Sequence, residues 1–441
     1  MQKRLKVLLA SPYAPPLLLA GVAVLAYGLL LPQMGFYWDD VPMSWIRYEL
    51  GPEAMTRYFS NNRPVWGLLY QITTRIFPQV PIYWQVFALF WRWVDALLVW
   101  AIVRELWPKQ TSFALVVSLF FLVYPGFNAQ WVSYLYSHFF IVLAFFLFSQ
   151  LCMLWAMRRG SRSLTALALL FSALNLWMME YFYVLELARG ALIWTGLRDD
   201  YDSRPARVRR TLRLWTPYAA LFAAAAFSRV FIFNNQVYGL GLLPRLKTDF
   251  FTTLWSLIQN ALVSFWTVSA AAWMQAFRLP DPAVHGPRTI LVYAAVVLVA
   301  FLFVFALLRA RQDAPEPRER QRREACWAIG LGLIMLPFAS APFWLIDLPV
   351  TLGFPANRFT LPSMLAVSLI LAGLIRWLPA NNFRVGLIAA LVALAVGCQF
   401  LWATDFSRDW AVQKNLFWQM TWRAPGLQSD TLVLMNEELQ F

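Results

Sequence analysis

The sequence predicts an all-α polytopic membrane protein with about eleven transmembrane helices, within a range of ten to thirteen. Of its 441 residues, 60% are hydrophobic and 14% are charged, whereas a soluble globular protein usually carries about 25% charged residues. Apolar runs of about 20 residues, the length that a helix needs to cross a bilayer, recur along the chain. The 23 tryptophans are typical of a protein with many helix ends at two membrane interfaces.

The expected spans follow from these apolar runs in chain order. They lie near residues 13–34, 81–103, 110–124, 133–157, 164–181, 182–197, 212–233, 289–309, 325–346, 359–378 and 383–403. The first run has no convincing small-residue cleavage site, so we expect a retained span. Segment 64–78 is apolar but carries Gln, Thr and Arg, and we expect it to lie at the interface. Segment 251–277 either spans or forms a partly submerged helical hairpin.

The distribution of basic residues decides the topology. With the N-terminus inside and 251–277 not spanning, 22 of the 37 basic residues fall in six short inner segments, as the positive-inside rule requires. If 251–277 spanned, the arginine-rich segment 309–324 would lie outside. The net charge of +14 therefore reflects topology, and no nucleic-acid-binding motif appears. We expect the C-terminus outside, with residues 405–441 as an outer tail or as the start of a soluble domain.

The first outer loop, Phe36–Pro64, holds the adjacent carboxylates Asp39 and Asp40. Two short segments with helical aromatic spacing follow, separated at Gly51-Pro52, and we expect them to lie on the membrane surface. The functional interpretation is that this loop is half of an active site. The alternative is a solvated turn in which Asp40 caps the first short helix. Since adjacent side chains point apart, we expect one Asp to act in chemistry and the other to bind or cap.

Other candidate residues lie on the same predicted side. Arg63, Arg229 and Arg358 are candidate ligands for a phosphate or diphosphate group, because guanidinium groups bind phosphate through paired hydrogen bonds. The alternative for each is a snorkelling interfacial arginine. His138 is a candidate hydrogen-bond donor to a sugar or phosphate, or else a structural histidine. Glu180, at the same depth, is a candidate second acidic group.

Charged pairs within the spans have a simpler interpretation. Arg92 and Asp95 are three residues apart, as are Glu186 and Arg189, and each pair is expected to neutralise itself inside the membrane. No cluster of residues with metal-ligand spacing appears, so a divalent metal has no support from the sequence, and no cofactor is expected with certainty.

The motif Tyr37-Trp38-Asp39-Asp40, followed by two interfacial helices and Arg63-Pro64, resembles the first outer loop of the GT-C superfamily. These are integral-membrane glycosyltransferases that use polyprenyl-phosphate-linked sugars, and they include the aminoarabinose and protein O-mannosyl transferases. The resemblance implies a catalytic Asp in this loop, matched by Asp39 or Asp40, and a lipid donor whose phosphate lies at the outer leaflet. It matches Arg358 loosely to a phosphate ligand, and Glu180 or His138 to a second polar group.

The resemblance also implies an organisation and a location. The transmembrane domain would cover residues 1–404, with a common module over 1–233 and more variable helices over 234–404. It would lie in a bacterial inner or plasma membrane, with its active site on the outer face. The chain departs from the family pattern in its second outer loop, where Gly126–His138 holds no Asp or Glu, which leaves the acceptor side and any metal open.

Three functions remain in competition. The first is transfer of a hexose or pentose from a polyprenyl-phosphate donor to an unidentified acceptor, with a first-loop Asp as general base. The second is a transporter or flippase of lipid-linked glycans, which needs a polar path that few spans here supply. The third is an enzyme similar to O-antigen ligases or polymerases, for which the loop 234–288 offers Arg245 and His285.

Overall fold

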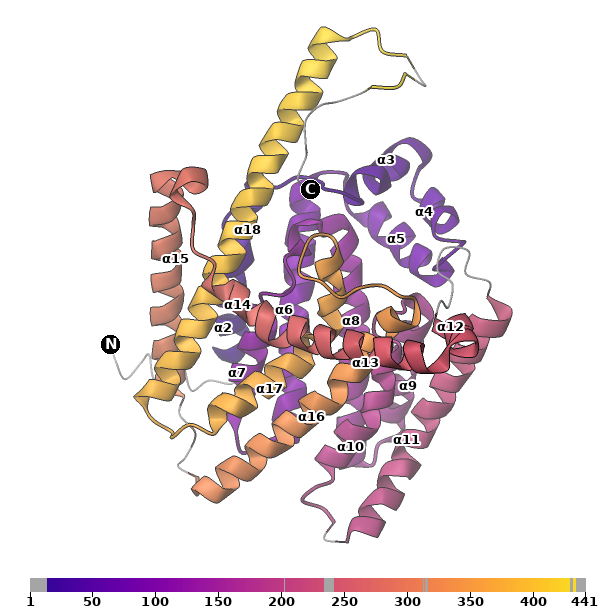
Figure 1. Cartoon of the computed structure of the whole chain (residues 1–441), viewed down its shortest axis with the longest axis vertical. Coiled ribbons are helices and arrows are strands. Elements are labelled where there is room, and N and C mark those ends of the chain that lie inside the picture. Colours follow the sequence, from indigo (N-terminus) through magenta and orange to yellow (C-terminus); the bar gives the residue numbers. More distant parts are fainter. Residues whose placement is uncertain are drawn as a thin grey trace.

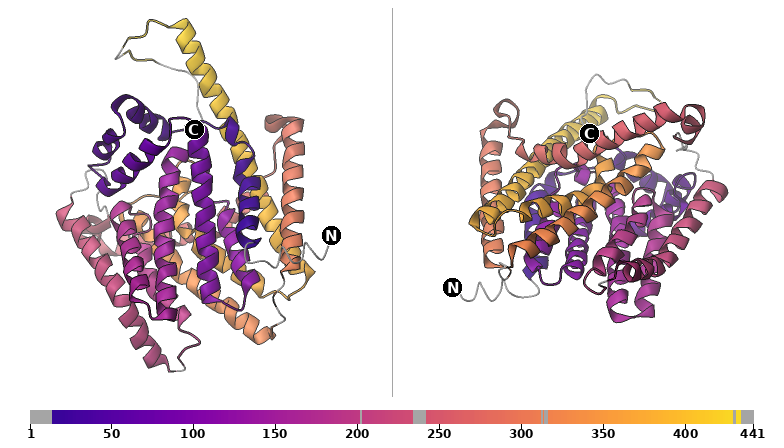
Figure 2. Two further views of the ribbon diagram at one scale, coloured as in Figure 1. Left: turned by 180° about the vertical axis from the view of Figure 1, so that it is seen from behind. Right: turned by 60° about the horizontal axis from the view of Figure 1, so that its bottom comes forward.

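The computed structural model describes residues 14–201, 203–233, 242–311, 313, 316–428 and 431–433. Every regular element within these ranges is a helix, which confirms the expected all-α class for this part of the chain. The helices form a bundle in which α6 and α8 stand side by side (Figures 1 and 2).

Eight helical segments of the described chain are long and apolar enough to cross a membrane, as expected for a multi-pass membrane protein. They are Ala14–Gln33 (α2, Ala14–Ala23, continued by η1, Val24–Gly28, and η2, Leu31–Gln33), α6 (Pro81–Leu106), α8 (Ser133–Arg159), α11 (Arg204–Phe227) with η5 (Ser228–Ile232), α15 (Pro282–Ala310), α16 (Arg318–Leu345), η8 (Ala356–Ser363) with α17 (Met364–Arg376), and α18 (Asn382–Arg423).

The remaining three expected spans have a different form. Segments 110–124 and 164–181 contain the shorter apolar helices α7 (Thr111–Leu122) and α9 (Arg162–Met178). Segment 182–197 is divided into η4 (Val184–Ala188) and α10 (Arg189–Gly196). The expected count of eleven therefore stays a prediction.

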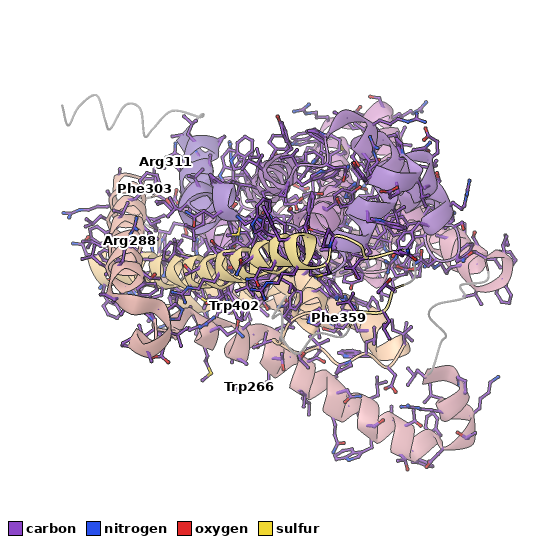
Figure 3. The ribbon with its side chains drawn as sticks, turned by 90° about the horizontal axis from the view of Figure 1, so that it is seen from above. Trp266, Arg288, Phe303, Arg311, Phe359 and Trp402 are labelled. Atoms are coloured by element: carbon purple, nitrogen blue, oxygen red, sulfur yellow. The ribbon has the colours of Figure 1, made fainter. Side chains whose placement is uncertain are left out.

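The ambiguous segment 251–277 is helical throughout. After α12 (Leu242–Thr248), α13 (Phe250–Trp266) continues through η6 (Thr267–Ala271), α14 (Ala272–Met274) and η7 (Gln275–Phe277). This run lies across the bundle, crosswise to α6 and α8 (Figure 1). It packs on α16, where Trp344 Nε1 donates a hydrogen bond to Ser264 Oγ at 3.1 Å. Viewed from above, it follows one edge of the molecule, and the exposed Trp266 lies on that edge (Figure 3).

The first loop and the apolar segment 64–78 that follows it form a small helical group at one end of the bundle. It consists of α3 (Asp40–Leu50), α4 (Glu53–Tyr58) and α5 (Pro64–Ile76) (Figure 1). Gly51 ends α3 with φ of +80°, a backbone conformation that glycine adopts without steric cost. Trp45 and Tyr48 on α3 are exposed, so both are available to contact a membrane surface, as the interfacial prediction requires.

The C-terminal segment continues a spanning helix. α18 passes residue 404 without a break and reaches Arg423, so that its C-terminal part projects beyond the bundle (Figure 1). The start of the expected tail at residue 405 is therefore helical and continuous with the helix of the last expected span.

Candidate functional site

The loop between the first span and α3 is anchored to α18. Tyr37 is fully buried, and its hydroxyl donates a hydrogen bond to Phe406 O at 2.9 Å. Gly35 lies against Trp410 so closely that a Cβ atom would come within 1.9 Å of the indole. Trp38 then adopts a φ of +47°, which is uncommon for a residue other than glycine. This tight turn fixes the directions of the two aspartates that follow it.

Asp40 points into the protein. Its side chain is fully buried, and its two oxygens accept hydrogen bonds from the backbone N–H groups of Tyr134 at 3.2 Å and Leu135 at 2.9 Å. Both N–H groups belong to the first turn of α8, which has no partners for them within the helix. Burial raises the pKa of the Asp40 carboxyl, and these two hydrogen bonds oppose that rise. Asp40 therefore caps α8, not α3, and ties the first loop to the second.

Asp39 points the other way. It is partly exposed, and the charged group that acts most strongly on it is the Arg358 guanidinium. Burial raises the pKa of the Asp39 carboxyl, and Arg358 opposes the rise. Arg358 itself lies over the rings of Trp38 and Phe359, with its guanidinium carbon 4.8 and 5.0 Å from the two ring centroids. These aromatic faces hold the cation beside the carboxylate.

A second group of charges lies at the same end of the bundle. Glu180 accepts a hydrogen bond from Arg63 Nε at 2.8 Å and forms an ion pair with Arg229. Arg229 also donates to Asn62 O at 3.4 Å. The three side chains are between 12% and 28% exposed, so they are partly shielded and still open to a ligand. Because two cations share one carboxylate, this triad keeps a net positive charge.

The two groups belong to one region. The Phe359 ring, over which Arg358 lies, has its centroid 6.0 Å from that of Tyr181, the neighbour of Glu180. Tyr136 of α8 lies within electrostatic range of both Asp39 and Arg358. The structure thus brings Asp39 and Arg63 of the first loop to the same end of the bundle as Glu180, Arg229 and Arg358, which lie in three other parts of the sequence. We call these five residues the outer-loop cluster, after the outer side that the sequence predicts for the first loop. A carboxylate beside a cation, next to further positive charge, can accept a proton close to a bound anion.

His138 has a different environment. It is fully buried, and its Nε2 and Nδ1 atoms lie 2.8 Å from Thr73 Oγ1 and from Tyr134 O. Its ring stacks on Tyr70 with the centroids 3.5 Å apart. Both ring nitrogens are therefore engaged by protein atoms, and these contacts favour the structural alternative for His138.

The sequence-based interpretation did not single out Tyr136 or Phe359. Tyr136 belongs to the same polar segment as His138, and the two-residue spacing turns its side chain to a different face of α8. Phe359 directly follows Arg358, and its position next to a candidate phosphate ligand is the only sequence feature that points to a role for it in the site. Neither signal identifies a site without the fold.

The intramembrane charged pairs are of two kinds. Arg189 and Glu186 form a buried ion pair at 2.7 Å, as expected. Arg92 instead donates to Leu122 O at 3.0 Å and to Gln130 Oε1 at 3.2 Å and lies over the Tyr27 ring. Asp95 attracts the Arg92 charge electrostatically, but neither Asp95 carboxylate oxygen has a hydrogen-bond partner in the described part of the chain. The expected direct neutralisation therefore holds for the second pair alone.

Neither the search for a metal site nor the comparison with known proteins narrows the choice of function. Among the described residues, no group of three or more His, Cys, Asp or Glu side chains is arranged to hold a metal ion. No family model matches this chain, and a search of curated proteins finds no significant match.

Proposed function

We propose that this protein is an integral-membrane glycosyltransferase that moves a sugar from a polyprenyl-phosphate donor to an acceptor hydroxyl at the outer membrane face. The observation that carries the proposal is the outer-loop cluster, in which the partly exposed Asp39 faces Arg358 and lies near the Arg63–Glu180–Arg229 triad. The eight apolar segments supply a membrane setting in which a lipid-linked donor would be available.

Each part of the cluster suits one requirement of this reaction. Asp39 takes the proton from the acceptor hydroxyl as the hydroxyl oxygen forms a bond to the anomeric carbon. The bond from that carbon to the phosphate oxygen breaks, and its electron pair leaves with the polyprenyl phosphate. Arg358 and the two arginines of the triad stabilise the phosphate through charge-assisted hydrogen bonds. Attack from the side opposite to the phosphate inverts the anomeric configuration.

Asp40 has a positioning role in this scheme. Its hydrogen bonds to Tyr134 and Leu135 hold the first loop against α8, and the turn at Trp38 then directs Asp39 toward Arg358. The geometry thus divides the acidic pair into a candidate general base and an anchor.

The test is a transfer assay in proteoliposomes with labelled polyprenyl-phosphate sugars, comparing wild type with Asp39→Asn. The proposal predicts that wild type releases sugar from the carrier and that the variant, folded to the same extent, does so about 10² to 10⁴ times more slowly. Equal transfer by both proteins would contradict the assignment of Asp39.

The transport alternative gives a different result in the same vesicles. A flippase would move the intact labelled lipid between leaflets without consuming it. Translocation without cleavage, across all donors offered, would replace the enzyme proposal with that alternative.

A further inference from the structure

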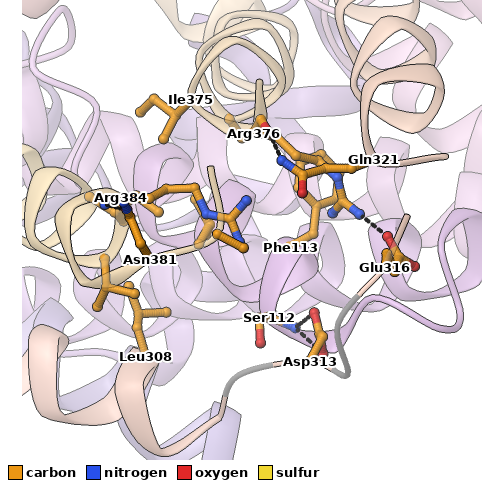
Figure 4. Close-up of a pocket in the computed structure, with 15 residues that line it drawn as sticks. Ser112, Phe113, Leu308, Asp313, Glu316, Gln321, Ile375, Arg376, Asn381 and Arg384 are labelled. Atoms are coloured by element: carbon orange, nitrogen blue, oxygen red, sulfur yellow. Dashed lines mark hydrogen bonds and ion pairs between the residues drawn. The ribbon is translucent and has the colours of Figure 1, made fainter. Parts of the chain in front are cut away.

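A cavity of about 210 Å³ lies at the opposite end of the bundle from the outer-loop cluster. It is partly open and is lined by the first turns of α7, α16 and α18, by the last turns of α15 and α17, and by Asp313 and Glu316 between α15 and α16 (Figure 4). The arginine-rich inner segments of the sequence gather at this end, which the positive-inside rule assigns to the cytoplasm. The inference below does not depend on the proposed glycosyltransferase activity.

The two carboxylates that line the cavity, Asp313 and Glu316, already have hydrogen-bond or ion-pair partners within the protein. Both Asp313 oxygens accept hydrogen bonds from the Ser112 backbone N–H, at 3.2 and 3.1 Å, and Thr111 Oγ1 donates to the same carboxylate at 2.9 Å. Asp313 thus satisfies the N-terminus of α7. Glu316 forms an ion pair at 2.7 Å with Arg376, the last residue of α17.

The positive charge of Arg384 is less fully neutralised by neighbouring carboxylates. It is partly buried in the first turn of α18, and its Nη1 donates one long hydrogen bond, to Leu378 O at 3.5 Å. Arg376 repels its charge and Asp313 attracts it, but no carboxylate of the described residues forms an ion pair with it. Figure 4 shows the Arg384 guanidinium extended into the cavity toward Phe113 and Arg376. In addition, Arg376 Nε is buried without a hydrogen-bond partner within the ranges that the structure describes.

These features describe a site with unused donors for an anion. Two guanidinium groups on adjacent helix ends suit a phosphate group, which accepts several charge-assisted hydrogen bonds at once. The N-terminus of α18 adds its dipole to the same space. The lining also includes the buried apolar side chains of Val116, Ile375 and Ile388. An amphiphile with an anionic head fits both halves.

We propose that this cavity binds a phosphate-bearing anion between Arg384 and Arg376, either the headgroup of an anionic phospholipid of the inner leaflet or a free phosphate. A lipid headgroup places its phosphate on the arginines and the start of its acyl chains along the apolar wall. Basic recesses between transmembrane helices at the cytoplasmic face are suited to such headgroups.

The experiment uses the purified, delipidated full-length chain in detergent. Binding of phosphatidylglycerol, phosphatidylcholine and inorganic phosphate is followed by native mass spectrometry and by the shift in the apparent Tm. Arg384→Gln is compared with Arg320→Gln, which removes the same charge from an exposed position on α16 outside the cavity. Val385→Phe keeps every charge and fills part of the apolar wall.

The proposal predicts that Arg384→Gln weakens phosphatidylglycerol binding about tenfold, with Arg320→Gln unchanged and phosphatidylcholine bound weakly by all variants. Loss of phosphatidylglycerol binding in Val385→Phe identifies the lipid as the ligand. If binding of inorganic phosphate is weakened by Arg384→Gln but not by Val385→Phe, the ligand is the free ion instead. Equal effects of Arg384→Gln and Arg320→Gln, or no effect of either, would overturn the proposal. Where Arg384→Gln does not fold, Arg384→Met replaces it, because methionine keeps the apolar stem and removes the charge and the donors; an unchanged affinity in that variant would also overturn the proposal.

Discussion

Substitution of the two adjacent aspartates should separate stability from catalysis. In Asp40→Asn, one oxygen of the side chain becomes an amide NH₂, so one of the two N–H groups at the start of α8 loses its acceptor. A buried N–H group left without a partner costs about 1–3 kcal/mol. In the part of the chain that the structure describes, the Asp39 carboxylate accepts no comparable hydrogen bond, and we expect Asp39→Asn to change stability by less than about 0.5 kcal/mol.

The assay pairs thermal unfolding in detergent with sugar transfer per folded molecule. Asp40→Asn should lower the apparent Tm by a few degrees, because in a large chain each kcal/mol shifts Tm by about 2–4 °C. Its folded fraction should keep transfer within about tenfold of wild type. Asp39→Asn should unfold as wild type does and lose transfer. The reverse result, with a stable but inactive Asp40→Asn and an active Asp39→Asn, would refute the assignment of roles.

Three further predictions concern the charges around the site and in the bundle. Arg358→Gln should move the acidic limb of the pH–rate profile to higher pH, because Arg358 lowers the pKa of Asp39 and transfer needs the ionised carboxylate; an unshifted limb would exclude Asp39 as the titrating base. Arg229→Gln should raise the KM for the donor about tenfold, because it removes a cation of the triad that binds the phosphate. Arg245→Gln, which breaks an exposed ion pair, is the control and should leave the KM unchanged. Equal KM values in the two variants would contradict a phosphate-binding role for the triad. Glu186→Gln should destabilise the protein by about 3–5 kcal/mol, because it leaves a buried guanidinium without its carboxylate; an unchanged apparent Tm would show that this ion pair is dispensable.

The helical class and most spans could be predicted because apolar runs of about 20 residues identify a transmembrane helix without any tertiary information. The segment 182–197 shows the limit of that approach. It is apolar by composition, yet Glu186 and Arg189 bond to Ser172 and Ser149 of neighbouring helices, and the chain there is divided into two short helices. Those partners are known only from the fold.

The division of work within the acidic pair illustrates the same limit. The sequence predicted that Asp39 and Asp40 would point apart, and it could not say which one faces the site. The answer depends on the N-terminus of α8, nearly a hundred residues away, which supplies the two N–H groups that Asp40 accepts. The cavity beside Arg376 and Arg384 could not be predicted from the sequence for a similar reason, since its lining residues come from the ends of five helices.

The most direct test of the central claim is the anomeric configuration of the product in a single-turnover reaction with a donor of known configuration. Direct displacement assisted by Asp39 predicts a fully inverted product from wild type and almost no product from Asp39→Asn. A product with retained configuration, or an inverted product formed at the wild-type rate by Asp39→Asn, would contradict the account.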